Sequence, residues 1–403
     1  MKLEIINREI FDEFVSGCDA NNFYQSIYMY DRLSVNNECY LLGGYKEDKL
    51  FGVCFLVLRS TFLGKKYFET YKGFITDFSN HEDIKLFSEG LIEFVKECGG
   101  YKLGIDPYIA RVSRDCNGNV TDEFDNSKLD DVFKSSGFKY IGVNEQVKWT
   151  YCLDTLKSSD LLFKEFSSNT RNTINRINNK YKLVIEELDY NDLDRFKRIT
   201  DMTSKRRGFV DCGMKYYQSM GKCFKEKVKF KVVSLNCDLY IDSLNSDILN
   251  IKSSLSKLSA SNSNKNKIDN LNIDLVNCES KLEEVNKLKE EYGNIIDLSA
   301  AMFMLYGDEV IYLFSGSDDR FMSFKGQYAL QWDMIKYASL NNYRRYNFYG
   351  ISGNFDPESK DYGVYSFKKS FGGYVEELLG NYEIGFGIVY KVRSIIDKFR
   401  GVK

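Results

Sequence analysis

The spacing of apolar residues predicts alternating strands and helices in the first part of the chain. Two apolar runs joined by a polar turn predict a hairpin of strands at 39–45 and 50–58. Apolar positions at helical spacing predict a helix at 84–98, which two glycines end before a short strand at 101–105. Strands and helices that alternate in this way are typical of a mixed α/β fold.

A second α/β unit begins near residue 147 and follows a similar plan, without a clean sequence repeat. Strands are expected at 148–155, 229–234, 302–305, 309–315 and 346–350, and helices at 161–181, 191–205 and 328–340. The chain therefore predicts two α/β subdomains.

A different pattern interrupts the second unit. Apolar residues recur every three or four positions from 244 to 258 and again from 268 to 285, as in the seam of a coiled coil. The polar tract at 259–266 separates the two runs, so the chain is expected to turn there. We expect an antiparallel helical hairpin at 241–296 that projects as an arm. Two separate helices packed on the body are the alternative.

Composition narrows the class of protein. A chain of 403 residues exceeds one ordinary domain. Its net charge of -2 excludes a globally basic nucleic-acid binder, so any RNA contact needs a local patch. The apolar runs are too short to span a bilayer, and the charged N-terminal segment is unlike a signal peptide.

Histidine and cysteine usage limits the available chemistry. The ten cysteines form no CxxC pair, which is typical of reduced thiols rather than a disulfide framework. The single histidine, His81, lies in a polar run and is expected in an exposed loop. We therefore expect no metal site and no cofactor, and no Ser-His-Asp or Cys-His arrangement.

Short motifs carry the remaining chemical signal. The two prolines lie in GIDPYI at 104–109 and in GISGNFDPES at 350–359, and YGVYSFKKSFGG follows at 362–373. TSKRRGF lies at 203–209 and YLFSGS at 312–317. In this order and spacing the motifs resemble the FemABX family of non-ribosomal peptidyl transferases, across nearly the whole chain.

The resemblance implies a fold and a set of boundaries. The family has two GNAT-like (acyl-CoA N-acyltransferase-like) α/β subdomains that face a cleft, and FemA-type members carry a coiled-coil arm. The implied first subdomain is 1–146, completed by 365–403. The implied second subdomain is 147–240 with 297–364, and the arm is 241–296.

The resemblance also implies an activity. The family transfers an amino acid from aminoacyl-tRNA to the stem-peptide amine of a peptidoglycan precursor, either lipid II or UDP-MurNAc-pentapeptide, and so builds the interpeptide bridge. Attack of an amine on an ester needs a proton acceptor or substrate assistance, and a group that stabilises the developing oxyanion. Direct attack without a covalent enzyme intermediate is the simplest route here.

Two residues are the catalytic candidates. Lys368 matches the lysine of the family's F-K motif and is expected to bind the oxyanion or a phosphate, on a strand from which Lys369 points the opposite way. Asp106 matches the aspartate of the I-D-P motif, which contacts the precursor or assists the amine. Its alternative role is to cap the turn that Pro107 begins. Phe367 is expected to form a wall of the site.

Substrate-binding candidates are basic or aromatic. Arg206 is expected to hold the diphosphate of the precursor, with Arg207 as the neighbouring choice. Arg32 falls near the family's N-terminal basic residue. Three tyrosines are candidates for lining the cleft: Tyr216, Tyr217 and Tyr312.

The expected partners follow from charge. Basic residues at 164–182 and 195–207 form a local positive surface for tRNA, or helix faces in water. The tail at 391–403 is a basic amphipathic segment for anionic lipid, or a solvated last helix. The expected location is the cytoplasm, with peripheral contact to the inner face of the membrane. Assembly as a homo- or heterodimer is left open.

Two rival functions stand beside the peptidyl transferase. A GNAT-type N-acyltransferase that uses acyl-CoA would need a pyrophosphate loop of the form R/Q-x-x-G-x-G/A, and the sequence has no convincing copy. A non-catalytic family member that binds partners through its arm is the other rival. Binding of acetyl-CoA, or release of the amino acid from charged tRNA, would discriminate between them.

Overall fold

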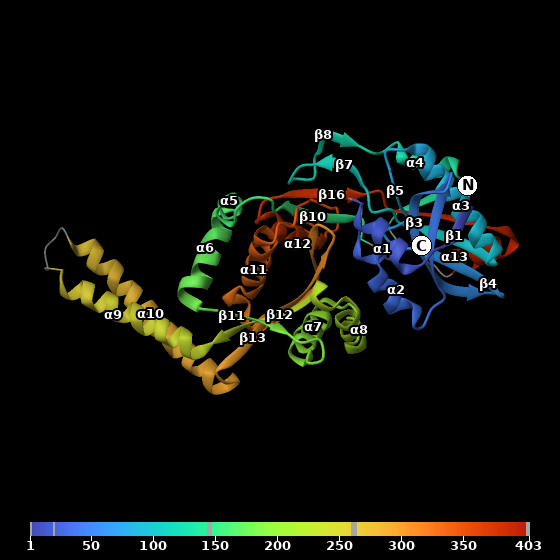
Figure 1. The fold of residues 1–403 in the computed structure, drawn as a ribbon. Coiled ribbons are helices and arrows are strands. Elements are labelled where there is room, and N and C mark those ends of the chain that lie inside the picture. The colour runs from blue at the N-terminus through green and yellow to red at the C-terminus, as the bar shows by residue number, and fades with distance from the viewer. Residues whose placement is uncertain (1, 19–20, 143–146, 259–263, 400–403) are drawn as a thin grey trace.

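Two β-sheets organise the chain in the computed structural model, which describes residues 2–18, 21–142, 147–258 and 264–399. The sheets lie next to each other, and a two-helix arm projects from the far side of the second (Figure 1). Helices cover the faces of both sheets, which confirms the mixed α/β fold.

The first sheet has the strand order β1-β2-β3-β4-β6-β17-β9, and β5 pairs with β3. Its strands are β1 (Lys2–Ile5), β2 (Cys39–Lys46), β3 (Lys49–Phe62), β4 (Lys65–Thr70), β5 (Ile75–Thr76), β6 (Gly100–Ile105), β9 (Lys139–Gly142) and β17 (Asn381–Gly385). Alternate residues of β3 face opposite sides. Val53 and Phe55 pack against one set of helices, and Cys54 and Leu56 pack against another.

Helices cover the first sheet on both sides. The helices are α1 (Arg8–Ser16) and α2 (Ile27–Ser34) on one face, and α3 (His81–Glu97) and α4 (Leu129–Ser135) on the other. His81, expected in a loop, is the first residue of α3, and Asn80 caps that helix by accepting from the backbone N–H groups of Glu82 and Asp83. The polar run is therefore a helix start.

The second sheet has the strand order β11-β12-β13-β14-β15-β10-β16-β7-β8. Its strands are β7 (Ala110–Arg114), β8 (Val120–Asp125), β10 (Trp149–Asp154), β11 (Val184–Leu188), β12 (Val228–Asn236), β13 (Ile295–Tyr306), β14 (Glu309–Ser317), β15 (Arg345–Gly350) and β16 (Tyr374–Leu378). The helices beside it are α5 (Ser159–Glu165), α6 (Ser168–Arg176), α7 (Asp194–Arg207), α8 (Met214–Phe224), α11 (Gly326–Leu340) and α12 (Tyr362–Lys369).

The single helix expected at 161–181 is broken, because Ser167 starts a new one. Its hydroxyl accepts a hydrogen bond from the backbone N–H of Thr170 at 3.2 Å, as an N-cap does. The chain therefore forms α5, α6 and a final π-helical turn at Ile177–Tyr181.

Three strands that the expected boundaries assign to the first subdomain belong to the second sheet. Strands β7 and β8 at 110–125 belong to the second sheet, although they precede residue 146. Strand β16 at 374–378 also lies there, and β17 and the helix α13 (Gly387–Phe399) return to the first sheet. The divisions at 146 and 365 therefore do not follow the sheets.

One apolar core joins the two subdomains. It contains Phe11 and Met29 from the first subdomain, with Phe196 and Tyr217 of α7 and α8 and Met302 of β13 from the second. Figure 1 shows α7 and α8 between the arm side and the first sheet. This shared core fixes the orientation in which the two subdomains meet.

The arm consists of α9 (Cys237–Ser256) and α10 (Lys265–Tyr292), which run antiparallel. The ion pairs Lys252–Glu279 at 3.1 Å and Lys289–Asp238 at 2.6 Å connect them. The turn expected at 259–266 falls mostly outside the described residues. The base of the arm belongs to the core of the second subdomain, because Leu244 there is buried.

The arm replaces the turn of a β-hairpin. Strands β12 and β13 pair antiparallel up to Asn236 and Ile295, and the arm leaves and returns between these two residues. The backbone N–H of Cys237 donates to the carbonyl of Asn294 at 2.9 Å, which closes the base. In the described part of the chain, no helix is both long and apolar enough to cross a membrane.

Candidate functional site

A pocket of about 610 Å³ in the second subdomain brings together four of the predicted residues. It lies among β13, β14, the end of α7, the start of α11, the end of β15 and α12. The predicted residues that line it are Arg206, Tyr312, Phe367 and Lys368. These residues are far apart in the sequence, so their convergence supports a common site.

Lys368 lies on a helix, which corrects the predicted strand. It is in the last turn of α12, and only 5% of its surface is exposed. Its ammonium donates to the carbonyl of Tyr349 at 3.1 Å and to that of Gly350 at 2.5 Å. Burial disfavours the charged form and lowers the pKa of Lys368 to about 7.

Lys369 faces away from the pocket even though the segment is a helix. Its ammonium donates to Asn117 Oδ1 at 2.6 Å and lies over the ring of Tyr365. Consecutive helical residues differ by about 100° in direction, so they face different surroundings. Lys369 therefore remains a matched control for Lys368.

Tyr349 was not predicted, and it connects Lys368 with the rest of the site. Its backbone is in the left-handed region, with φ 62°, and Asn347 Oδ1 accepts from its N–H at 2.7 Å. This conformation is costly for a residue with a Cβ and is typical of functional sites. It directs the Tyr349 carbonyl to Lys368.

The side chain of Tyr349 packs against the apolar core that also includes Tyr24 and Tyr216. Burial raises its pKa well above the usual value. The neighbouring hydroxyls of Tyr24 and Tyr216 and the charge of Asp106 raise it further. Tyr349 thus contacts Lys368 through its backbone, and the charge of Asp106 acts on its side chain.

Asp106 forms a buried ion pair with Lys72, which the sequence did not single out. The carboxylate and ammonium are 2.7 Å apart, and each side chain is at most 2% exposed. Strands β4 and β6 are parallel, so the residues after their carboxyl ends meet at one edge of the sheet. Burial raises the pKa of Asp106, and Lys72 opposes this shift.

The loop after Asp106 is fixed to the second sheet by Tyr108. The Tyr108 hydroxyl donates to Glu309 Oε1 at 2.8 Å and accepts from Arg345 Nη2 at 3.0 Å. Arg345 is buried and also pairs with Glu376 at 2.6 Å. This charged network joins the Asp106 loop to β14, β15 and β16.

Arg32 and Tyr216 meet where the subdomains join, and they do not line the pocket of Lys368. The Arg32 guanidinium lies 4.3 Å from the centre of the Tyr216 ring, and its Nε donates to Ser219 Oγ at 2.9 Å. Helix α2 carries Arg32 and α8 carries Tyr216. Because Tyr216 also neighbours Tyr349, this junction adjoins the pocket.

Two of the tyrosines have defined partners. Tyr312 lines the pocket, and its hydroxyl donates to Gln327 Oε1 at 2.8 Å. Tyr217 is fully buried and donates to Asp211 Oδ1 at 2.6 Å. Tyr217 is therefore a core residue, and the prediction that it lines the cleft is wrong.

Arg206 and Arg207 lie at the mouth of the pocket. They occupy the last turn of α7, whereas the sequence pattern predicts a helix that ends just before them, at residue 205. Gly208 then adopts φ 73° as the C-cap, which favours glycine. Both arginines are exposed, and neither forms an ion pair with a residue in the described ranges. They are free to bind an anionic group.

Part of the predicted basic surface is neutralised. Arg195 and Arg198 both bind the carboxylate of Asp297, at 2.6 Å and 2.7 Å. Lys197 lies beside Asp201 and Asp211. The positive surface on α7 therefore reduces to its last turn.

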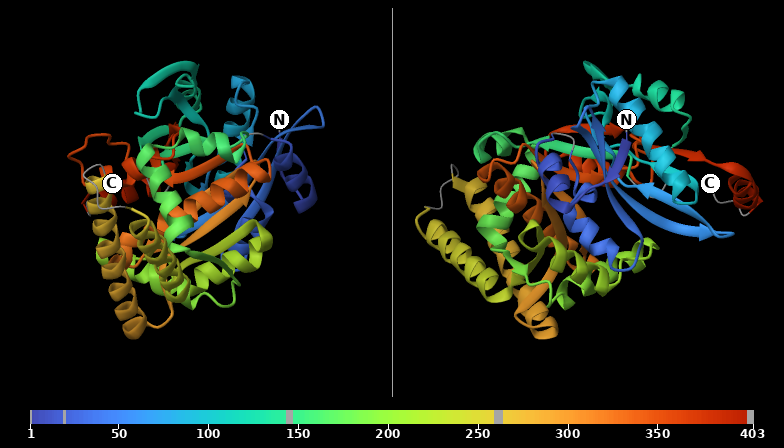
Figure 2. Two further views of the ribbon diagram at one scale, coloured as in Figure 1. Left: turned by 90° about the vertical axis from the view of Figure 1, so that its left-hand side faces the viewer. Right: turned by 45° about the vertical axis from the view of Figure 1, so that its right-hand side comes forward.

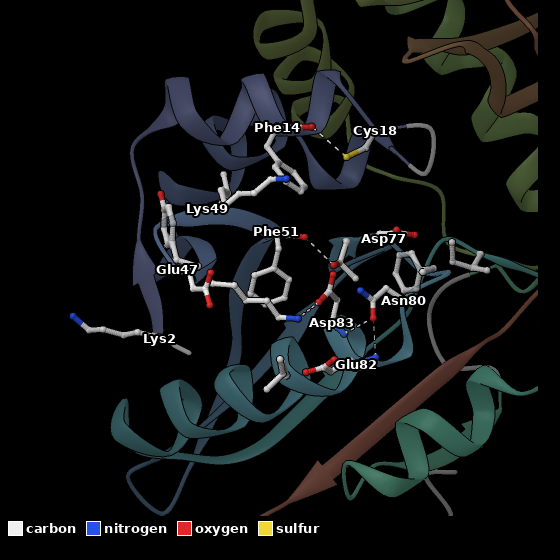
Figure 3. A pocket seen from close by; sticks show the side chains of 17 residues that line it. Lys2, Phe14, Cys18, Glu47, Lys49, Phe51, Asp77, Asn80, Glu82 and Asp83 are labelled. Carbon is white, nitrogen blue, oxygen red and sulfur yellow. Dashed lines mark hydrogen bonds and ion pairs between the residues drawn. The ribbon is translucent and has the colours of Figure 1, made fainter.

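A second pocket, of about 1370 Å³, lies in the first subdomain (Figure 3). Lys46 pairs with Asp83 in this pocket, and Asn80 caps α3. Its lining contains no residue of the predicted site. We therefore place the candidate site in the pocket of Lys368.

Comparisons with known proteins show the family and the fold of the chain. The model of the FemAB family matches residues 6–398. Aminoacyltransferase FemA of Staphylococcus aureus strain MRSA252 is 30% identical over 398 residues, covering 95% of this chain and 94% of that protein. FemA of strain N315 gives the same identity and coverage. The crystal structure of FemX shares the fold, with a TM-score of 0.78, 21% identity, and coverage of 98% of this chain and 100% of that one. The chain belongs to the FemAB family.

Proposed function

We propose that this aminoacyltransferase moves an amino acid from aminoacyl-tRNA to the stem-peptide amine of a peptidoglycan precursor. One observation carries the proposal: a buried lysine lines a pocket whose mouth holds two unpaired arginines. The name of the staphylococcal relative, aminoacyltransferase FemA, supports the reaction class. The reaction takes place at the cytoplasmic face of the membrane when the precursor is lipid-linked.

Lys368 stabilises the oxyanion in this proposal. A protonated lysine has three N–H donors, and the carbonyls of Tyr349 and Gly350 accept two of them. The third is free for the oxygen of the ester as the amine attacks. A donor fixed in a buried site needs no reorganisation during the reaction, which is the main source of such stabilisation.

Asp106 acts on the acceptor side. Its carboxylate is held by Lys72 at the edge of the first sheet where β4 and β6 end, and we place the incoming amine at this edge. Arg206 and Arg207 bind the diphosphate of the precursor, because a guanidinium matches phosphate oxygens in a bidentate manner. Arg32 and Tyr216 line the junction that the rest of the precursor follows, and Tyr312 and Phe367 shape the pocket.

The tRNA body requires a positive surface beside the pocket. Lys164, Arg176 and Lys182 carry no ion pair with a described residue. They lie on α5, on α6 and on the segment after α6, all in the second subdomain; Figure 2 shows these helices in green. We assign the phosphate contacts of tRNA to these residues and to the last turn of α7.

The experiment is a transfer assay with the full chain. Gly-, Ala- and Ser-tRNA are each incubated with lipid II and with UDP-MurNAc-pentapeptide, and the stem peptide is examined by mass spectrometry. Extension of the stem is the expected result, and Lys368→Ala abolishes it while Lys369→Ala does not. Failure with every pair, while S. aureus FemA is active on its own substrates in parallel, would refute the proposal. Acetyl-CoA binding in calorimetry would instead support the N-acyltransferase.

A further inference from the structure

Helix α13 turns its apolar side away from the protein. Four apolar side chains are exposed: Ile388 at 76%, Val392 at 38%, Ile395 at 57% and Phe399 at 88%. Their spacing of four, three and four residues places them on one stripe of the helix. A surface helix normally directs such a stripe to the core, but in α13 Val389 and Ile396 are half-buried and the stripe beside them is exposed.

Polar contacts hold the opposite side of α13 against the first subdomain. The Tyr390 hydroxyl donates to Glu383 Oε1 of β17 at 2.8 Å. Arg393 pairs with Asp397 at 2.9 Å and lies over the ring of Phe62 of β3. These contacts fix which side of the helix faces the body, so the apolar stripe stays outward.

The charges beside the stripe are positive. Lys391 and Lys398 are exposed on one flank of it, and no described carboxylate pairs with either. The single acidic residue of the helix, Asp397, is neutralised by Arg393. Next to Phe62, the turn between β3 and β4 exposes Leu63, at 70%, and Lys65, the first residue of β4, is exposed beside it. An apolar stripe with free cations is complementary to an anionic lipid surface.

We propose that α13 binds the surface of an anionic lipid bilayer. The helix lies flat, with its apolar stripe at the boundary of headgroups and acyl chains and with Lys391 and Lys398 at lipid phosphates. Its 13 residues are about 20 Å long, too short to cross the hydrocarbon core. Figures 1 and 2 show α13 beside β4, at the end of the molecule opposite the arm.

A second copy of the chain fits this surface less well. In a two-fold dimer formed through the stripe, each copy presents the same patch to the other. The flanking lysines of the two copies would then lie close together without a counter-charge. The charge pattern therefore favours lipid.

The experiment measures binding of the full chain to vesicles by co-sedimentation, without tRNA or precursor. Vesicles of phosphatidylcholine alone are compared with vesicles that contain phosphatidylglycerol. We expect binding to the anionic vesicles that weakens with salt. Lys391→Gln with Lys398→Gln lowers the partition coefficient about 25-fold, since each surface cation contributes about 5-fold. Ile395→Ser with Phe399→Ser also lowers it.

The control is Lys257→Gln with Lys287→Gln, which removes two exposed cations from the arm and leaves vesicle binding unchanged. Vesicle binding that none of the α13 variants weakens would overturn the proposal. Absence of binding to the anionic vesicles would overturn it too. A dimer that forms without vesicles and that Ile395→Ser dissociates would also overturn it, because the stripe would then bind a second copy of the chain. Because α13 lies outside the pocket, transfer to a soluble precursor should be the same in all variants. The test thus separates this proposal from the proposed function.

Discussion

Replacing Lys368 with methionine tests the central residue of the site in two independent ways. Methionine has a similar length and no charge, so the volume of the buried side chain is nearly kept. The carbonyls of Tyr349 and Gly350 lose their donor, which costs about 1–3 kcal/mol of unfolding free energy at every pH. The ammonium also contributes a second effect, which depends on pH.

The magnitude of the second effect follows from the pKa of Lys368. Burial lowers it from 10.5 to about 7. Between these values the unfolded chain binds more protons than the folded one, so the stability of the wild type rises with pH. A shift of one pKa unit corresponds to about 1.36 kcal/mol. Below pH 7 the lowered pKa of Lys368 therefore reduces the unfolding free energy of the wild type by about 5 kcal/mol. Between pH 7 and pH 10 the unfolding free energy of the wild type rises by about 3–4 kcal/mol, because the unfolded chain loses its proton as well.

The assay is urea unfolding of wild type and Lys368→Met at several pH values from 7 to 10. The difference in unfolding free energy should move by about 3–4 kcal/mol in favour of the wild type as the pH rises, since the variant lacks the group. Lys369→Met is the control and should show no such trend. A difference that stays constant over this range would show that Lys368 is not buried as a shifted lysine.

Four further outcomes are expected. Transfer in single turnovers should fall at least ~100-fold in Lys368→Met, and in the wild type it should fall as the pH rises above 7, because the oxyanion donor is the protonated lysine. Asp106→Asn should cost about 3–5 kcal/mol in urea unfolding by leaving the Lys72 charge unpaired, and adding Lys72→Met should restore most of it. Arg206→Ala should raise the KM for the precursor with little change in kcat, and an equal effect on both constants would contradict a role in binding. Replacing residues 249–277 of the arm with a short Gly-Ser linker should leave the body folded, as near-ultraviolet circular dichroism would show, because the buried base remains.

Much of the fold could be predicted, because the elements with regular apolar spacing are also the buried ones. The expected strand at 309–315 is β14, and the helix at 328–340 lies within α11. The place of β7, β8 and β16 in the second sheet could not be predicted, because strand pairing depends on contacts far apart in the chain. The GNAT-like character of each subdomain stays a prediction.

The site was harder to predict than the fold. At the end of α12, Tyr365 and Lys368 are buried at helical spacing. Because lysine is rarely buried, the apolar pattern that would predict this helix is incomplete. Lys72 is paired with Asp106 only because β4 and β6 run parallel. Nothing in the amino-acid sequence around Tyr349 indicates a left-handed backbone, since the surrounding structure imposes that conformation. The motifs therefore supplied the candidate residues, and the tertiary contacts determine how those residues are held.

The arm grows from a hairpin turn, and this has a consequence for its length. The neighbouring backbone bonds at Cys237 and Asn294 close its base whatever lies beyond them. Adding or removing one heptad from both α9 and α10 keeps their seam in register and leaves β12, β13 and the pocket unchanged. The reach of the arm can therefore change during evolution independently of the chemistry, so relatives with arms of different lengths can carry the same pocket.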